Sequence, residues 1–225
     1  MVSSKQKMKI IIVVPVFNEE KHLENFLKDL TKTNFEIVVV DDGSTDFSYK
    51  LIQKFKVHRL KHKINLGKGS AMKTGAEAAF NLGADAIIFM DADEQHKVKD
   101  LPEFTQKLKE GYDVVLGSRN LGLKVPLVRF IGNKSASVLI NILFSIYVSD
   151  LLCGFRAVTK KAYKKMKLES QGYGIETEMV IKIKQFKLKY CEVPVATVYY
   201  DKVKGVTILD AFSILFNVIF WRFRK

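Results

Sequence analysis

The sequence is poor in cysteine and has no long hydrophobic run. Its two cysteines, Cys153 and Cys191, form no C-x-x-C pair and have no cysteine or histidine partner at metal-ligand spacing. They therefore predict a reducing compartment and no structural role. No uninterrupted apolar stretch reaches the roughly 18 residues that suggest a spanning helix. The basic start of the chain leads only into a short apolar run cut by Pro15, which is not the pattern of a signal peptide. We expect a cytosolic protein.

Acidic residues are also in short supply. There are 24 aspartates and glutamates against 37 lysines and arginines, which gives a formal net charge of +13. Such a charge implies an anionic partner, namely nucleic acid, an anionic membrane face or a phosphorylated substrate. The lysines are dispersed over predicted helices and no nucleic-acid recognition motif is present, so nucleic acid is disfavoured. The length of 225 residues suits one domain with one sizeable core.

Short, β-branched apolar runs alternate with helical patterns along the first part of the chain. Runs of this kind are typical of strands that are covered on both faces. Asn18 is placed to cap the helix that follows the first run. The alternation predicts an α/β fold with a doubly wound, mostly parallel sheet. The predicted strands lie at 10–14, 35–40, 57–60, 86–90 and 113–117, and later helices at 71–82 and 98–110.

The ends of the predicted strands carry the densest polar clusters. Asp41 and Asp42 follow the second run, Asp91 and Asp93 the fourth, and Arg119 the fifth. Ligands of doubly wound sheets bind at the carboxyl ends of the strands. Two carboxylates one residue apart offer the hard oxygen ligands that suit Mg²⁺ or Mn²⁺, if a turn brings them together. A lone Asp-x-Asp could be a solvated loop, but three such strand ends favour a binding site.

Gly67 and Gly69 come just before a predicted helix. Glycines at this point can let backbone N–H groups approach a phosphate. The spacing matches neither a P-loop nor GxGxxG, so it is a weak signal by itself.

The second half of the chain contains two strongly apolar helical patterns. The segment 126–149 has one narrow polar stripe, and 206–225 has a similar stripe followed by basic residues. Both suit amphipathic helices in a membrane interface, although burial against the domain or in a homodimer would also explain them. We expect a domain at 1–205, with 126–149 as a membrane-facing helix inside it, and an interfacial helix at 206–225. The stripe of the first helix consists of Arg129, Asn133, Ser137, Asn141 and Ser145.

A series of motifs resembles family 2 inverting glycosyltransferases of the GT-A fold. Within that family the combination is similar to the polyprenyl-phosphate sugar synthases, the dolichyl-phosphate mannose and dolichyl-phosphate glucose synthase group. The resemblance covers roughly residues 8–204. The motifs, in order, are Pro15–Glu20, Val39–Asp46, Asn65–Gly69, Asp91–His96, Gly117–Arg119, and Asp150 followed by Cys153–Arg156 and Glu192–Pro194.

The resemblance implies roles for individual residues on the donor side. Asp91, Asp93 and Gln95 would bind Mg²⁺ or Mn²⁺, and Arg119 would lie near the donor or the acceptor phosphates. Glu19 would bind the ribose and Asp42 the base. The implied catalytic residues are Asp93, Arg119 and Lys202. The implied donor-binding set is Pro15, Phe17, Glu19, Val40, Asp42, Lys68, Asp91, Ala92 and Asp93.

The acceptor side matches the family less closely. The loop 199–205 occupies the place of a basic loop that receives the lipid phosphate, but the arginine often seen there is absent. The implied acceptor-binding residues are Arg129, Lys134, Lys202 and Lys204, and for the last two a solvated surface is the alternative. Glu176 could position the sugar or a basic group, or could simply be an acid at a helix start. His62 is expected at the surface.

The implied activity is inverting transfer of a hexose from a nucleotide sugar, of the GDP-mannose or UDP-glucose type, to a polyprenyl or dolichyl phosphate. It would take place at the cytosolic face of the membrane, with peripheral attachment. A homodimer or a membrane-anchor subunit is a further expected partner. The alternative is a family 2 enzyme that acts on a glycan, a protein or a diacylglycerol-type lipid.

Overall fold

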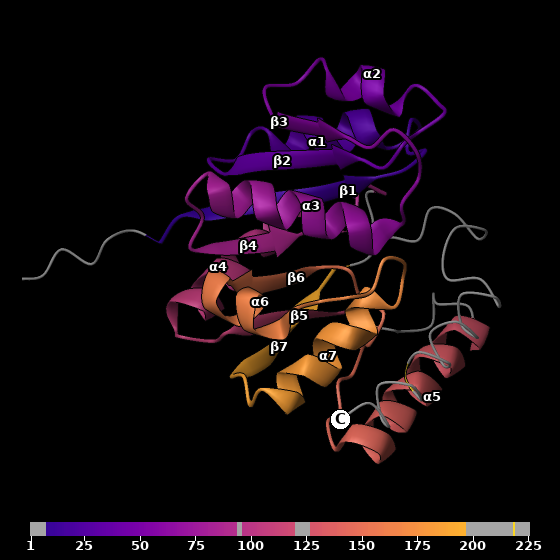
Figure 1. Ribbon diagram of the computed structural model, residues 1–225, viewed down its shortest axis with the longest axis vertical. Coiled ribbons are helices and arrows are strands. Elements are labelled where there is room, and N and C mark those ends of the chain that lie inside the picture. The colour runs from indigo at the N-terminus through magenta and orange to yellow at the C-terminus, as the bar shows by residue number, and fades with distance from the viewer. Residues whose placement is uncertain (1–7, 94–95, 120–126, 197–217, 219–225) are drawn as a thin grey trace, which may run out of the picture.

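The computed structural model describes residues 8–93, 96–119, 127–196 and 218, and within 127–131 only the backbone. Seven strands form one sheet in the order β3-β2-β1-β4-β6-β5-β7 (Figure 1). β6 runs antiparallel to both of its neighbours, and the other paired strands are parallel. The prediction of a doubly wound, mostly parallel α/β sheet is confirmed. The strands are β1 (Ile10–Val16), β2 (Glu36–Asp41), β3 (His58–Lys61), β4 (Ala86–Phe89), β5 (Val114–Arg119), β6 (Arg156–Thr159) and β7 (Tyr190–Val195).

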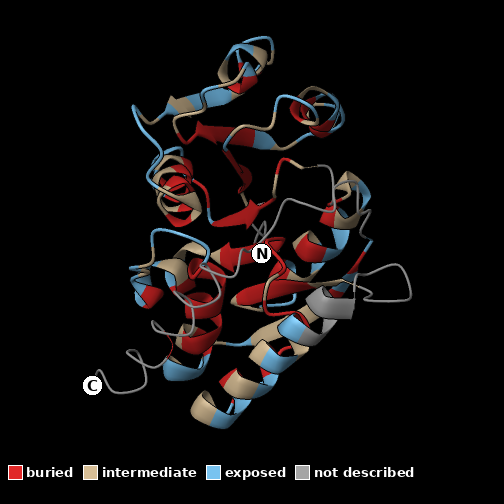
Figure 2. Cartoon of the chain, turned by 90° about the vertical axis from the view of Figure 1, so that its right-hand side faces the viewer, coloured by how far each residue is buried: buried red, intermediate tan, exposed pale blue. Residues whose placement is uncertain are grey.

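Helices cover both faces of this sheet. Successive strand residues point to opposite faces, so Val13 and Val38 belong to the core under α3, α6 and α7, whereas Ile12 and Val39 belong to the core under α1 and α4. Figure 2 shows the central strands as the buried middle of the molecule, whereas the edge strand β3 is mostly exposed. The helices are α1 (Leu23–Leu30), α2 (Ser48–Ile52), α3 (Lys68–Asn81), α4 (Leu101–Lys109), α5 (Leu127–Phe144), α6 (Lys160–Met166) and α7 (Ile175–Gln185), with a 3-10 turn at Val98–Asp100.

The start of the first helix differs from the prediction. α1 begins at Leu23, and Asn18 does not cap it. Asn18 instead adopts a left-handed backbone with φ of 53°. Its backbone N–H donates to Ser44 Oγ, and its side-chain oxygen accepts from the backbone N–H of Thr45, at 3.0 and 2.9 Å. Asn18 therefore joins the ends of β1 and β2.

Helix α5 lies to one side of the other elements (Figures 1 and 2). Asn133 and Ser137 are buried toward the domain. On the outer surface, Val138 is 50% exposed and Ile142 is 72% exposed. Within the described residues, no helix combines the length and the apolar character that crossing a bilayer requires. The predicted helix at 206–225 lies outside the described residues, apart from the buried Val218.

Close packing of α3 on the sheet leads to a test of the fold. A Cβ atom on Gly75 would overlap Val13 Cγ1 and would lie 3.1 Å from Val40 Cγ2. We expect Gly75→Ala to lower the free energy of unfolding by about 1–3 kcal/mol, because a packed core has no room for an added carbon. Urea denaturation measures this change. Gly132→Ala is the control: its Cβ meets no atom within 4 Å, so the better helix propensity of alanine should leave stability equal or higher. Equal effects of the two substitutions would contradict the packing argument.

Candidate active site

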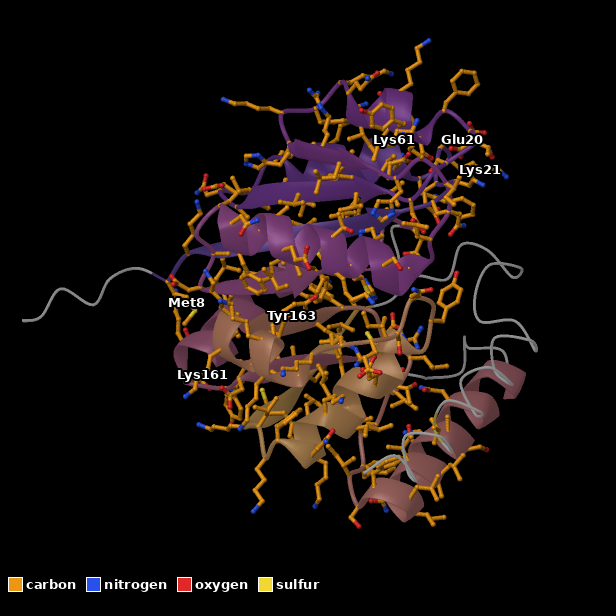
Figure 3. The ribbon with its side chains drawn as sticks, viewed as in Figure 1. Met8, Glu20, Lys21, Lys61, Lys161 and Tyr163 are labelled. Atoms are coloured by element: carbon orange, nitrogen blue, oxygen red, sulfur yellow. The ribbon has the colours of Figure 1, made fainter. Side chains whose placement is uncertain are left out.

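The carboxyl edge of the sheet brings together strand ends that are distant in the sequence. Arg156, at the start of β6, pairs with Phe89 on β4 and with Leu116 on β5. The two parallel strands therefore end at the same edge. Met8 precedes β1 and Glu20 follows it, so in Figure 3 these two residues mark the amino and the carboxyl ends of the parallel strands. The site lies at the carboxyl ends, on the side of Glu20.

An ion cluster joins the start of α3, the end of β4 and the start of α7. Lys68 Nζ lies 2.7 Å from Asp91 Oδ1 and 2.8 Å from Glu176 Oε1. The Glu176 side chain is only 4% exposed, and those of Lys68 and Asp91 are 18% and 24% exposed. Of the roles considered for Glu176, the structure supports the positioning of a basic group, because it holds Lys68 beside Asp91.

The members of this cluster stabilise each other's charged forms. Burial by itself would lower the pKa of Lys68 and raise the pKa of Asp91, since it disfavours charge. The carboxylates of Asp91 and Glu176 outweigh burial and raise the pKa of Lys68. The positive charge of Lys68 likewise lowers the pKa of Asp91. At neutral pH the edge therefore presents an ammonium group next to an ionised carboxylate.

Arg156 connects the backbone segments next to this cluster, and its side chain is completely buried. Its guanidinium donates to three backbone carbonyl oxygens at 2.5, 2.8 and 2.6 Å, those of Leu151, Cys153 and Glu176. The 151–153 turn is thereby tied to the first turn of α7. The next residue, Gly154, packs directly on Asp91: a Cβ there would overlap Asp91 Oδ2 and lie 2.8 Å from its Cγ. The position of the Asp91 carboxylate thus depends on a glycine at 154.

Arg119, at the end of β5, forms a two-pronged ion pair with Asp150. Arg119 Nε donates to Asp150 Oδ2 at 2.6 Å and its NH2 group donates to Oδ1 at 2.8 Å. Asn133 on α5 also donates to Oδ1, at 2.8 Å. Burial would raise the pKa of Asp150, but the hydrogen bonds and charge of Arg119 outweigh it and lower that pKa. The guanidinium is therefore fixed in orientation by an ionised carboxylate.

Asp42 was expected to contact the base of the donor. In the structure it holds the 62–67 loop. Its Oδ1 accepts from Leu66 N at 3.0 Å and lies 2.6 Å from His62 Nδ1, and its Oδ2 accepts from Gly67 N at 2.8 Å. His62 was expected at the surface, yet its side chain is only 11% exposed. The expectation was wrong because Asp42 draws the imidazole inward. Together these contacts fasten the 62–67 loop to the end of β2.

Gly67, at the end of this loop, and Gly69, in the first turn of α3, both serve packing. A Cβ on Gly67 would lie 2.6 Å from Gln171 O, and one on Gly69 would lie 2.6 Å from Ser170 O. Ser70 N also donates to Gln171 O, at 3.0 Å. The start of α3 is covered by this backbone, so the glycine spacing reflects close loop contact, and phosphate approach is not needed to explain it.

The other predicted donor-binding residues surround the same edge. Phe17, directly after β1, is 41% exposed, and Pro15 is buried within β1. The backbone N–H of Glu19 donates to Ser48 Oγ at 2.8 Å. Val40 and Ala92 are buried in the core. Asp93 is half-buried in the turn after β4.

A histidine and a cysteine lie beneath the acidic turn. His96 Nε2 is 3.9 Å from Cys153 Sγ, and the imidazole packs on the ring of Phe155. Burial lowers the pKa of His96 and raises the pKa of Cys153 to about 12. Cys153 thus remains a thiol at neutral pH and is unsuited to act as a nucleophile.

Comparison with known proteins identifies the family. The family model described as glycosyl transferase family 2 matches residues 11–167. The UDP-N-acetylglucosamine–dolichyl-phosphate N-acetylglucosaminyltransferase of Methanococcus voltae is 32% identical, over 96% of this chain and 97% of its own. The chain belongs to glycosyl transferase family 2. This glycosyltransferase is also 30% identical to the dolichol-phosphate mannosyltransferase of Pyrococcus furiosus, over 95% of this chain and 64% of the relative.

A solved structure shows the same fold. Glucosyl-3-phosphoglycerate synthase from Mycobacterium tuberculosis, in complex with Mn²⁺, UDP and phosphoglyceric acid, superimposes with a TM-score of 0.75 at 18% identity, covering 96% of this glycosyltransferase and 78% of that chain. The likeness, at this identity, is one of fold.

The residues of this glycosyltransferase fit a divalent cation whose remaining ligands come from substrate phosphates. Asp91 and Asp93 supply carboxylate oxygens in one turn, and Mg²⁺ is usually bound by one or two carboxylates together with substrate phosphates and water. Across the described parts of the chain, no group of three or more His, Cys, Asp or Glu side chains could enclose a metal. Two carboxylates in one turn suit a site that is shared with substrate phosphates.

Several predicted residues cannot be placed. Gln95, Lys202 and Lys204 lie outside the described residues, and Arg129 lies on α5 without a described side chain. Lys134, by contrast, is described, and its Nζ donates to Ser149 O at 3.0 Å. Its ammonium group is therefore engaged with the protein's own backbone.

Sequence reasoning missed the second layer of the site. No partner was predicted for Asn133 or Glu192, yet Asn133 binds Asp150 and Glu192 Oε1 accepts from Ser149 N at 2.7 Å. The only sequence signal for them was their place, Asn133 in a polar stripe and Glu192 in a family-like motif. Neither signal indicates a partner.

Proposed function

We propose that this glycosyltransferase transfers a hexose from a nucleotide sugar to a polyprenyl phosphate, with inversion, at a membrane surface. The observation that carries the proposal is that Asp91, Lys68 and Arg119 lie at one edge of the sheet, in a chain whose close relative from M. voltae is named for a dolichyl-phosphate acceptor. The P. furiosus relative, named for dolichol phosphate, supports the same acceptor class. The two relatives are named for different sugars, so the donor is left to experiment.

The charged groups of the site suit the departure of a nucleoside diphosphate. Asp91 and Asp93 would hold the cation, which when bound offsets the negative charge that develops on the leaving group. Lys68 and Arg119 supply fixed positive charges at the same edge, and such preorganised charges cost no reorganisation during the reaction. A lipid monophosphate is already an anion at neutral pH. It can attack without a catalytic base, and none is assigned here.

Helix α5 supports a membrane-facing role. Among its described residues the polar Asn133 and Ser137 are buried together with the apolar Ile140, while the apolar Val138 and Ile142 are exposed on the outer surface. Together with the net charge of +13, this suits attachment to the anionic cytosolic leaflet. In this proposal 1–205 is the catalytic domain, 206–225 is a second interfacial helix, and Arg129, Lys134, Lys202 and Lys204 serve the acceptor.

The test is transfer from radiolabelled GDP-mannose, UDP-glucose and UDP-N-acetylglucosamine to dolichyl phosphate in detergent, with Mg²⁺ or Mn²⁺ and with a chelator. We expect one donor to give an organic-extractable product that the chelator abolishes. No lipid product from any donor, with sugar transferred to a glycan, a protein or a diacylglycerol lipid, would replace the acceptor in the proposal. Transfer to dolichyl phosphate that persists in the chelator would overturn its metal dependence.

A further inference from the structure

The Asp150 carboxylate accepts four hydrogen bonds. The proposed chemistry gives it no role. Its side chain is 1% exposed. Besides the two guanidinium bonds and the bond from Asn133, its Oδ2 accepts from the backbone N–H of Arg119 at 3.1 Å. Both oxygens are thus bonded to the same arginine, and one of them also to α5. A buried carboxylate with this set of donors fixes geometry very tightly.

The segment that carries Asp150 is itself held from three sides. The adjacent Ser149 donates through N and Oγ to Glu192 Oε1 on β7, at 2.7 and 2.8 Å. Its Oγ lies 2.5 Å from Ser118 Oγ on β5. Its carbonyl oxygen accepts from Lys134 on α5. Asp150 therefore cannot shift without disturbing β5, β7 and α5 together.

This arrangement controls what Arg119 can offer to a ligand. A guanidinium has five N–H donors in one rigid plane, and Asp150 takes those of Nε and one from NH2. The plane, and with it the direction of the remaining N–H groups, is set by Asp150. Loss of this pair would keep the charge of Arg119 but remove the two bonds that orient its guanidinium plane.

We infer that Asp150 is a positioning residue, which holds the Arg119 guanidinium in the orientation that binds the donor diphosphate. The inference rests on the proposed function, in which Arg119 lies at the leaving diphosphate. Because Asn133 shares the carboxylate, the same contact makes the orientation of Arg119 depend on the place of α5, the helix proposed to face the membrane.

The test measures binding of UDP and of GDP, with Mg²⁺, to the full chain by calorimetry. We expect the unmodified protein to bind one of them, and Arg119→Ala and Asp150→Asn each to weaken that binding roughly 10- to 100-fold, since small misplacement of a binding group has effects of this size. The double variant should bind no more weakly than Arg119→Ala alone. A positioning residue acts through its partner, whereas independent effects would add. Asp113→Asn is the control, because Asp113 lies at the opposite end of β5 and the amide still accepts from Lys189 N.

Each outcome decides a separate point. Binding by Asp150→Asn that equals the Asp113→Asn control overturns the inference and leaves the role of Arg119 intact. Additive losses in the double variant also overturn it, since they would reveal a general structural effect. Unchanged binding by Arg119→Ala, or no nucleotide binding at all, removes the proposed role of Arg119 and the inference with it. If Asp150→Asn does not fold, Arg119→Lys replaces it: lysine keeps the charge but not the two-pronged pair, so binding close to that of the unmodified protein would overturn the inference.

Discussion

Replacing Asp91 with asparagine is expected to lower the rate of glycosyl transfer about 10²- to 10³-fold, the usual effect of removing one group that stabilises charge in a transition state. A neutral amide is a much weaker ligand for Mg²⁺ or Mn²⁺ than a carboxylate. Folding should be little affected. Lys68 would still lie 2.8 Å from Glu176 Oε1 and would not become an unpaired buried charge. Product formation, Mn²⁺ affinity by electron paramagnetic resonance and the melting temperature measure the three effects.

Asp85→Asn is the matched control for this substitution. Asp85 directly precedes β4, whereas Asp91 follows it, and its Oδ2 accepts from the backbone N–H of Lys9 at 2.8 Å. The control removes a charge from the other edge of the sheet, so transfer and Mn²⁺ affinity should be unchanged. Transfer by Asp91→Asn at the unmodified rate would exclude Asp91 as a required ligand. A large loss of stability instead would mean that the ion cluster serves the fold.

The strands that build the site could be predicted because their amino-acid sequences are apolar enough to indicate burial on both faces of the sheet. β1, β2 and β4 are short, continuous apolar runs, and each ends in turn-forming polar residues. β6 and β7 gave no such signal. β6 begins with Arg156, a residue type that is mostly exposed in proteins, and its burial here depends on carbonyl groups of the 151–153 turn and of α7. No local pattern reports partners of that kind.

The polar partners within the site were harder to predict than its location. The narrow polar stripe of α5 predicted an amphipathic helix, but the direction of its faces depends on Asp150, which lies 17 positions beyond Asn133. Asn18 carried a helix-capping signal that the end of β2 overrode. For Asn18, two long-range hydrogen bonds outweighed a capping preference worth about 1 kcal/mol.

Gly154→Ala tests whether the position of the Asp91 carboxylate matters as well as its charge. The φ angle of Gly154 is outside the left-handed region that disfavours side chains, so alanine can adopt the same backbone. Its methyl carbon, however, would overlap Asp91 Oδ2 and lie 2.9 Å from Oδ1. The Asp91 carboxylate must then move away from residue 154. We expect transfer to fall about 10²-fold, a loss typical of displacing a reacting group by roughly 1 Å, with Mn²⁺ affinity reduced in parallel.

Gly172→Ala provides the comparison, because a Cβ at this loop position meets no atom within 4 Å. It should retain both transfer and Mn²⁺ affinity. Gly154→Ala leaves every charged group of the site in the chain, so a loss confined to this variant can only come from geometry. Unchanged transfer by Gly154→Ala would mean that the carboxylate tolerates displacement and that its charge alone is used. If Gly154→Ala lowers transfer as much as Asp91→Asn does, a displaced carboxylate contributes no more to transfer than an amide at the original position.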